Sequence, residues 1–214
     1  MNKKQQYLLG VKAGTPVIVG FIPVAIAYAI MAGQSGLTVF QTILMSVMVF
    51  AGASQMMAVG MLAQGASLFA MIVATFILNL RHLIMSTCVM NRLRYSKTGF
   101  NLFLAFGVTD ESFAIFTTSE EEKSTSFFFL GLVTVTYSSW VVGTIIGSFA
   151  SQLLPRIISD SLGIALYAMF IGLLIPNVKN NIKLGAVVIL AVLINVILAN
   201  FMATSWAIII STLL

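Results

Sequence analysis

Polar and charged residues lie inside an apolar stretch of residues 66–90, and their types suit chemistry or ion binding. The stretch is long and apolar enough to cross a bilayer, yet it contains Asn79, Arg81 and His82. A charged side chain at the bilayer centre costs on the order of 3 kcal/mol on insertion scales, so such residues face a cavity or a partner. Helical spacing places four polar residues on one face: Thr75, Asn79, His82 and Ser86.

The next apolar stretch, residues 100–118, contains the acidic pair Asp110 and Glu111. If it forms a hairpin with the preceding helix, Arg81 and Asp110 each lie about ten residues from the connecting loop. At a rise of about 1.5 Å per residue, both would stand on the order of 15 Å deep. We therefore expect Arg81 and His82 to meet Asp110 and Glu111 near the middle of the membrane.

Two interpretations of this polar cluster remain open. The first is a structural ion pair that holds two helices together. The second is a site for a zwitterionic or ionic substrate, or a proton relay through a carboxylate and His82. Ionisable residues within a membrane most often have a functional role. Our hypothesis is therefore that Arg81, His82, Asp110 and Glu111 take part in gating or coupling. Neighbouring helical residues point about 100° apart, so the two acids are expected to divide these roles.

The composition defines the class of protein. Of 214 residues, 59% are hydrophobic and 8% are charged, whereas soluble domains carry about 25% charged residues. We predict one all-α, polytopic integral membrane domain over residues 1–214, in the cell membrane. The eleven basic residues are scattered, so the net charge of +5 fits membrane orientation and not nucleic-acid binding. One cysteine and one histidine exclude an intrachain disulfide and a multi-histidine metal site.

No nucleotide-binding loop, nucleophile–base set or cofactor motif is present in the sequence. We therefore expect no enzyme activity and no cofactor, and any transport would be driven by a gradient or by a separate subunit.

Apolar stretches predict about seven membrane segments, since one crossing needs about 20 residues. The stretches are residues 13–33, 37–64, 66–90, 100–118, 125–152, 161–176 and 184–214. The sequence also suggests, more weakly, an internal inverted repeat of residues 13–90 with 125–214. The observation behind it is that each half contains asparagine within an apolar stretch. Gly143 and Gly147 are four residues apart and predict close helix packing.

Orientation signals predict that the stretch 37–64 is broken or re-entrant. Lys3, Lys4 and Lys12 place the N-terminus in the cytoplasm, and the basic loop at 92–97 should lie there too. Three full crossings before that loop would place it outside. A break near Gly52 removes the conflict. On this interpretation residues 120–122, three glutamates, lie outside and Arg156 lies inside.

A helix that restarts near Gly52 would present unpaired N–H groups and a positive dipole end to a substrate carboxylate. We assign Gly52, Ser54, Gln55 and Asn79 to substrate binding. Simple close packing of small residues is the alternative. Five methionines could line the same cavity or merely fill gaps: Met45, Met48, Met56, Met57 and Met61.

Three short motifs resemble the AzlC-type branched-chain amino acid permease family, large subunit. They are Phe50–Gln55 (FAGASQ), Asn79–His82 (NLRH) and Thr109–Phe113 (TDESF), in this order along the chain. The resemblance implies export of branched-chain amino acids or analogues such as azaleucine. It also implies a small hydrophobic membrane subunit of the AzlD type as partner.

We therefore expect a secondary transporter subunit, and proton coupling and a homo-oligomer are further hypotheses. Two alternatives stay open: a channel or exporter for another small solute, and a non-transporting membrane scaffold.

Overall fold

The computed structural model describes residues 2–93, 98–120, 125–151, 171, 175, 178–179, 182–202, 206–207 and 210–211. Four helices in this part of the chain are long and apolar enough to cross a membrane: α1 (Lys3–Gln34), α4 (Leu68–Arg92), α7 (Ser126–Ala150) and α9 (Ile182–Ala199). The all-helical class is confirmed. The number of seven segments is not, because two of the predicted segments are broken and residues 161–176 lie outside the described residues except Ile171 and Ile175.

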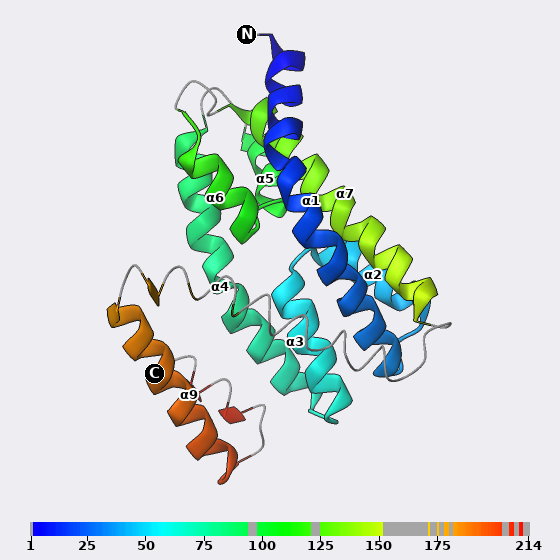
Figure 1. The fold of residues 1–214 in the computed structure, drawn as a ribbon, viewed down its shortest axis with the longest axis vertical. Coiled ribbons are helices and arrows are strands. Elements are labelled where there is room, and N and C mark those ends of the chain that lie inside the picture. Colours follow the sequence, from blue (N-terminus) through cyan, green and yellow to red (C-terminus); the bar gives the residue numbers. More distant parts are fainter. Residues whose placement is uncertain are drawn as a thin grey trace.

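Helices α1 and α7 form the central pair of the bundle and run parallel (Figure 1). Their backbones approach closely at glycines. A Cβ on Gly10 would stand 1.9 Å from the carbonyl oxygen of Phe128, and a Cβ on Gly147 would stand 2.7 Å from Cα of Ile26. Gly10 lies against Phe128, and further along both helices Ile26 lies against Gly147, so α1 and α7 run in the same direction. The packing role predicted for Gly143 and Gly147 is confirmed.

The predicted break in residues 37–64 is present between α2 (Val39–Val49) and α3 (Gly52–Ala63). Phe50 ends α2 with φ of 43°, in the left-handed region that a bulky residue rarely adopts. The Tyr137 hydroxyl donates a hydrogen bond to the carbonyl of Val47 at 2.8 Å, which satisfies one of the free carbonyls at the end of α2.

Residues 100–118, predicted as one crossing, form a second broken pair. Helix α5 (Thr98–Phe106) ends before Gly107, and α6 (Asp110–Thr118) begins after Thr109. The backbone breaks because Thr109 caps α6 in a reciprocal arrangement with Ser112: the Ser112 N–H donates to Thr109 Oγ1 at 3.3 Å, and the Thr109 N–H donates to Ser112 Oγ at 2.8 Å. The hairpin expected between two continuous helices is therefore wrong.

Each broken pair returns to the end of the bundle from which it entered. The Arg92 guanidinium at the end of α4 donates hydrogen bonds to the carbonyls of Thr117 and Ser119 at the end of α6. The ammonium of Lys3 lies 5.3 Å from the ring centroid of Phe127, so α1 and α7 also begin at one end.

This arrangement corrects one topology prediction. Glu120 lies at the same end as the N-terminus, and not at the opposite end, because residues 98–118 re-enter and do not cross. Residues 121–122 and Arg156 lie outside the described residues.

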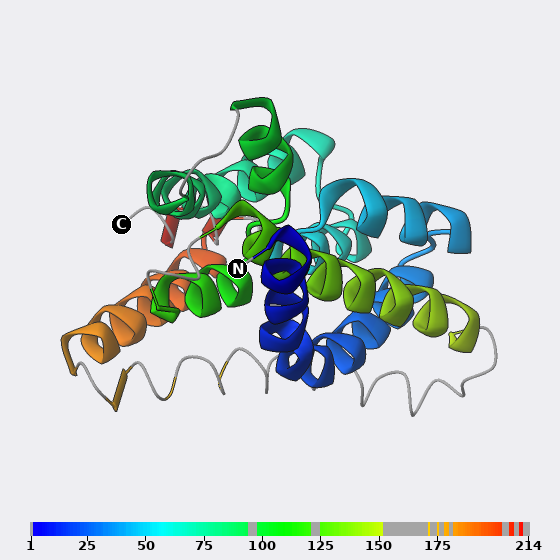
Figure 2. The ribbon, with the colours of Figure 1, turned by 90° about the horizontal axis from the view of Figure 1, so that it is seen from above.

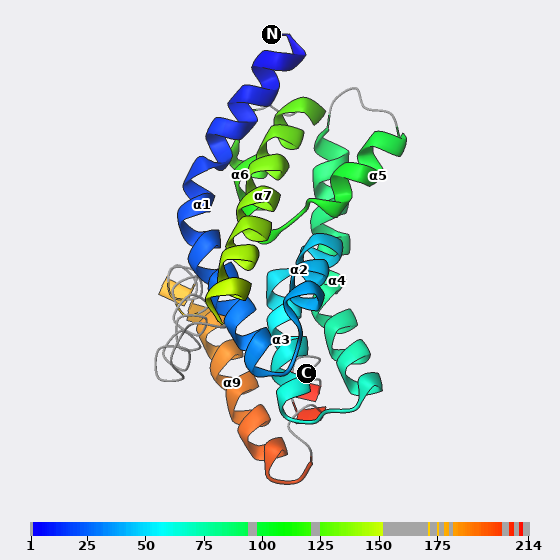
Figure 3. The same ribbon diagram turned by 90° about the vertical axis from the view of Figure 1, so that its right-hand side faces the viewer.

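The two broken pairs enter from opposite ends, with α2 and α3 in the lower half and α5 and α6 in the upper half (Figure 3). A long helix followed by a broken pair thus occurs twice in opposite directions, in residues 3–63 and 68–118. The sequence suggested 13–90 with 125–214, and much of the second range is not described. Seen along the long axis, α9 and α2 lie on opposite sides of the bundle (Figure 2).

Candidate functional site

A cavity of about 60 Å³ lies where the two chain breaks meet inside the bundle. The breaks themselves are close, since the rings of Phe50 and Phe106 have centroids 6.3 Å apart. A volume of this size, in a polar setting, has room for a few water molecules.

The wall of the cavity is divided by polarity. Its polar residues come from α4 and from the start of α6: Arg81, His82, Thr109, Asp110 and Glu111. Its apolar side chains come from α1, α2–α3 and α7: Phe21, Val24, Phe50, Met56 and Trp140. The backbone at the start of α3 completes the wall with Ala51, Gly52 and Ala53. The wall therefore presents charged groups on one side and apolar groups on the other.

Arg81 and Asp110 form an ion pair across the polar side, with 2.8 Å between Nη1 and Oδ2. Their side chains keep 38% and 47% of their surface exposed, so neither charge is sealed in the protein interior. His82 and Glu111 are half-buried beside them. The expected meeting of these four residues is confirmed, and their roles in gating or coupling stay predictions.

Two helices begin at the cavity, α3 at Gly52 and α6 at Asp110. Residue Ala51 gives α3 no side-chain cap. A helix start carries roughly half a positive charge from its unpaired N–H groups. The two positive ends therefore face a space that also contains the Arg81 guanidinium, and the carboxylates of Asp110 and Glu111 offset part of this charge.

Gly52 is placed where its lack of a side chain matters. A Cβ at this position would stand 2.6 Å from Cη2 of Trp140, closer than real carbon contacts. The indole therefore packs directly against Gly52. Of the four residues assigned to substrate binding, Gly52 is the one that lines the cavity.

Gln55 and Ser54 use their side chains elsewhere. Gln55 is fully buried; its Nε2 donates to Ser46 Oγ at 3.1 Å, and its Oε1 accepts from Trp140 Nε1 at 3.2 Å. Ser54 Oγ donates to the carbonyl of Ala51 at 3.0 Å. Neither side chain lines the cavity, so their contact with substrate stays a prediction.

Asn79 is half-buried on α4 and also lies outside the residues that line the cavity. Its Oδ1 is buried and has no hydrogen-bond partner among the described residues. The four residues of the predicted polar face, Thr75, Asn79, His82 and Ser86, are all half-buried. His82 is the member of this face that reaches the cavity.

The methionine lining is mostly absent. Met56 lines the cavity, whereas Met45 packs against the core cluster and Met48 is exposed. Met57 and Met61 pack in a separate cluster between α3 and α4.

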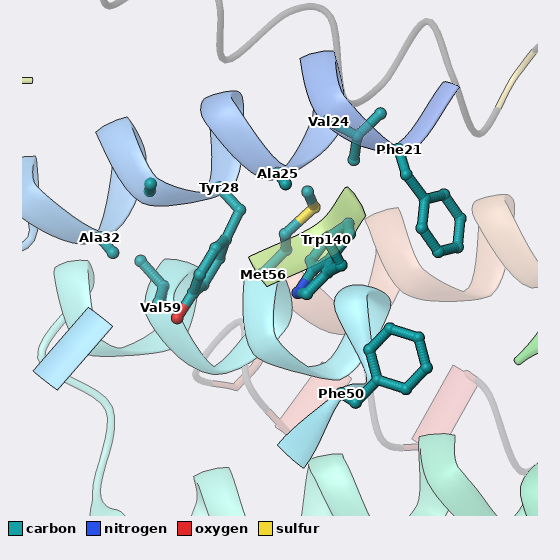
Figure 4. Packing of buried hydrophobic residues seen from close by; sticks show 10 residues of the cluster. Phe21, Val24, Ala25, Tyr28, Ala32, Phe50, Met56, Val59 and Trp140 are labelled. Carbon is teal, nitrogen blue, oxygen red and sulfur yellow. The ribbon is translucent and has the colours of Figure 1, made fainter. Parts of the chain in front are cut away.

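The sequence interpretation missed the residues from α1 and α7 that form the apolar wall. Phe21 and Trp140 meet edge to face with centroids 5.6 Å apart, close to Met56 and Phe50 (Figure 4). The available signal was a single tryptophan among small residues, since Ser138, Ser139 and Gly143 surround Trp140 in the sequence. A large ring in such a setting must fill space left by its neighbours.

The broken helices and the intramembrane ion pair define a multi-pass membrane protein with a polar site inside its bundle. The comparisons with known proteins then give the family. A family model described as "AzlC protein" matches residues 16–154, and the chain belongs to this transport-related membrane family.

Several curated proteins are similar over most of their length. An uncharacterized membrane protein of Archaeoglobus fulgidus is 33% identical over 97% of this chain and 94% of its own. The inner membrane protein YgaZ of Escherichia coli is 30% identical over 82% of this chain and 74% of its own. The branched-chain amino acid transport protein AzlC of Bacillus subtilis is 29% identical over 83% and 71%. No solved structure matches the chain.

Proposed function

We propose that this chain is the large subunit of a secondary transporter that exports small apolar amino acids, of the branched-chain type, across the cytoplasmic membrane. The observation that carries the proposal is the divided cavity at the two helix breaks. A zwitterion would place its charged groups beside Arg81, Asp110 and the start of α3, and its side chain against Phe21 and Trp140. The name of the AzlC relative supports the same substrate class.

The broken helices supply the binding groups such a substrate needs. In transporters, half-helix starts point at anionic substrate groups and lie at the interface of inverted repeats. Here α3 and α6 begin at one cavity and run from it to opposite ends of the bundle. The Arg81–Asp110 pair would offer one charge of each sign to the ammonium and carboxylate of the substrate, and exchange of partners during binding would couple occupancy to helix position.

Two further parts of the proposal are the energy source and the partner. Half-buried Glu111 and His82 beside the ion pair could carry a proton, so we propose coupling to the proton gradient. An efflux rate that does not change when a pH gradient is imposed would contradict the proposed coupling to protons. A small hydrophobic membrane subunit of the AzlD type is proposed as partner, and co-purification of the two chains tests it.

The test is retention of labelled leucine in cells that produce the chain with this small subunit. Asp110→Asn, which keeps the size of the side chain and removes its charge, is compared with wild type at equal abundance in the membrane. Glu120→Gln, an exposed residue at the end of the bundle, is the matched control. We expect wild type and the control to lower retention, and Asp110→Asn to restore it to the level of empty cells.

A leucine level that wild type does not change would contradict the proposed substrate. Equal export by wild type and Asp110→Asn would contradict the proposed site, while leaving transport itself standing. A panel of small solutes in the same cells separates the alternative of a channel or exporter for another solute.

A further inference from the structure

Trp140 is the largest apolar side chain at the cavity, and it is fixed from several sides. Its ring stacks with Tyr28 at 6.1 Å between centroids and meets Phe21 edge to face at 5.6 Å. Its Cη2 covers the backbone of Gly52. The residue is 3% exposed and lines the cavity.

A buried chain of hydrogen bonds sets the angle of the indole. Gln55 Oε1 accepts from Trp140 Nε1, and Gln55 Nε2 donates to Ser46, whose hydroxyl lies 2.8 Å from that of Thr144. Thr144 Oγ1 in turn donates to the carbonyl of Trp140 at 2.9 Å. The chain therefore closes on Trp140 and links α2, α3 and α7. All of its side chains are buried, so breaking one of these bonds would leave a buried polar group without a partner.

We propose that Trp140, held by Gln55, sets the size of the apolar side chain that the cavity accepts. The inference rests on the proposed function and adds the residue that determines specificity. With the charged end of the substrate at Arg81 and Asp110, the substrate side chain points across the cavity toward the indole. A rigid ring at this place limits length, because packed protein interiors yield little.

Gln55 acts in this proposal as a positioning residue. Gln55 does not line the cavity, but it holds the ring of Trp140, which does. Its replacement would let the ring move and would thereby change which substrates fit. A purely structural role for Gln55 would lower transport of every substrate by the same factor. The two roles are therefore separable by a ratio of activities.

The experiment measures competition with labelled-leucine efflux by valine, leucine and phenylalanine in the complete complex, for wild type, Trp140→Phe and Gln55→Met. One methylene in an apolar pocket changes selectivity by about 10- to 200-fold. We expect the preference for leucine over phenylalanine to fall by about tenfold in Trp140→Phe, and in the same direction in Gln55→Met. Phe129→Leu, a fully buried change on the same helix outside the cavity, should leave the preference unchanged.

A binding measurement keeps the result interpretable if a variant transports poorly. In a Trp206→Phe background, Trp140 is the sole tryptophan, since the chain has two. Leucine should alter the fluorescence of Trp140. In the Gln55→Met variant, phenylalanine should alter this fluorescence at a concentration about tenfold lower than in the protein that retains Gln55.

Leucine export with an unchanged leucine-to-phenylalanine preference in both variants would overturn the role of Trp140 and leave the proposed function intact. Absence of both leucine export and a leucine-dependent fluorescence change in wild type would overturn the two together.

Discussion

Arg81 in the middle of α4 and Asp110 at the first residue of α6 form an ion pair on the polar side of the cavity, with 2.8 Å between Nη1 and Oδ2. Asp110 occupies the first turn of α6, where a negative charge is also favoured by the helix dipole. The aspartate therefore has two attractive partners, the Arg81 guanidinium and the positive end of α6. This arrangement leads to the first prediction.

Removal of the whole ion pair should strongly impair transport while the protein stays folded. Replacing both partners of an ion pair by apolar residues leaves no unpaired charge inside the membrane, so Arg81→Met with Asp110→Leu should shift the unfolding temperature in detergent by only a few degrees. Leucine efflux should fall at least tenfold, because the charged end of the substrate loses both partners. Efflux at the wild-type rate from the double variant would favour the scaffold interpretation.

Gly52→Ala should impair transport strongly, because the new Cβ would stand 2.6 Å from the Trp140 ring. Either the ring or the start of α3 must move. Overpacking of this kind costs about 1–3 kcal/mol, and we expect efflux to fall by about tenfold or more.

Gly60→Ala is the matched control on the same helix, since nothing lies within 4 Å of its added Cβ. It should retain efflux and gain slight stability from the higher helix propensity of alanine. Equal efflux by the two variants would show that the contact between Gly52 and Trp140 has no role in transport.

Two features of the site can be predicted from the sequence: the charged residues within apolar helices and the helix break near Gly52. A charged residue in an apolar helix requires a partner, and this argument led to Arg81, His82, Asp110 and Glu111. The break near Gly52 followed from small residues in a stretch too long for one crossing. Both signals are local in the sequence, which is why they could be interpreted without a structure.

Other features depend on contacts between distant residues. The sequence assigns Gln55 to substrate binding, yet its amide is hydrogen-bonded to Ser46 and to Trp140, which is 85 positions away in the sequence. The break at Gly107 was missed because residues 100–118 have the length of a normal crossing. One missed break reverses the direction of every later segment, and this explains the wrong side for Glu120.

Gly107→Ala should destabilise the second break, because the added Cβ would stand 2.1 Å from Cγ1 of Val133 on α7. We expect a loss of about 1–3 kcal/mol and a matching fall in efflux. Combination with Val133→Ala should recover much of both, since it removes the methyl groups that clash. Gly99→Ala on α5, with nothing within 4 Å of the new Cβ, should behave as wild type. Failure of the double variant to recover would place the requirement for Gly107 in its backbone freedom and not in this contact.

Labelling of single cysteines should place Glu120 and Asn2 on one side of the membrane and Gln64 on the other. The structure requires this because α1 and α7 begin at the same end and both broken pairs return to their own ends. In a Cys88→Ser background, Gln64→Cys should react with an impermeant maleimide added to intact cells, given the cytoplasmic N-terminus that the basic residues predict. Asn2→Cys and Glu120→Cys should react only after the membrane is permeabilised. Reaction of Glu120→Cys in intact cells, with Asn2→Cys protected, would mean that residues 98–118 cross the membrane, and the meeting of two helix starts at one cavity would then be wrong.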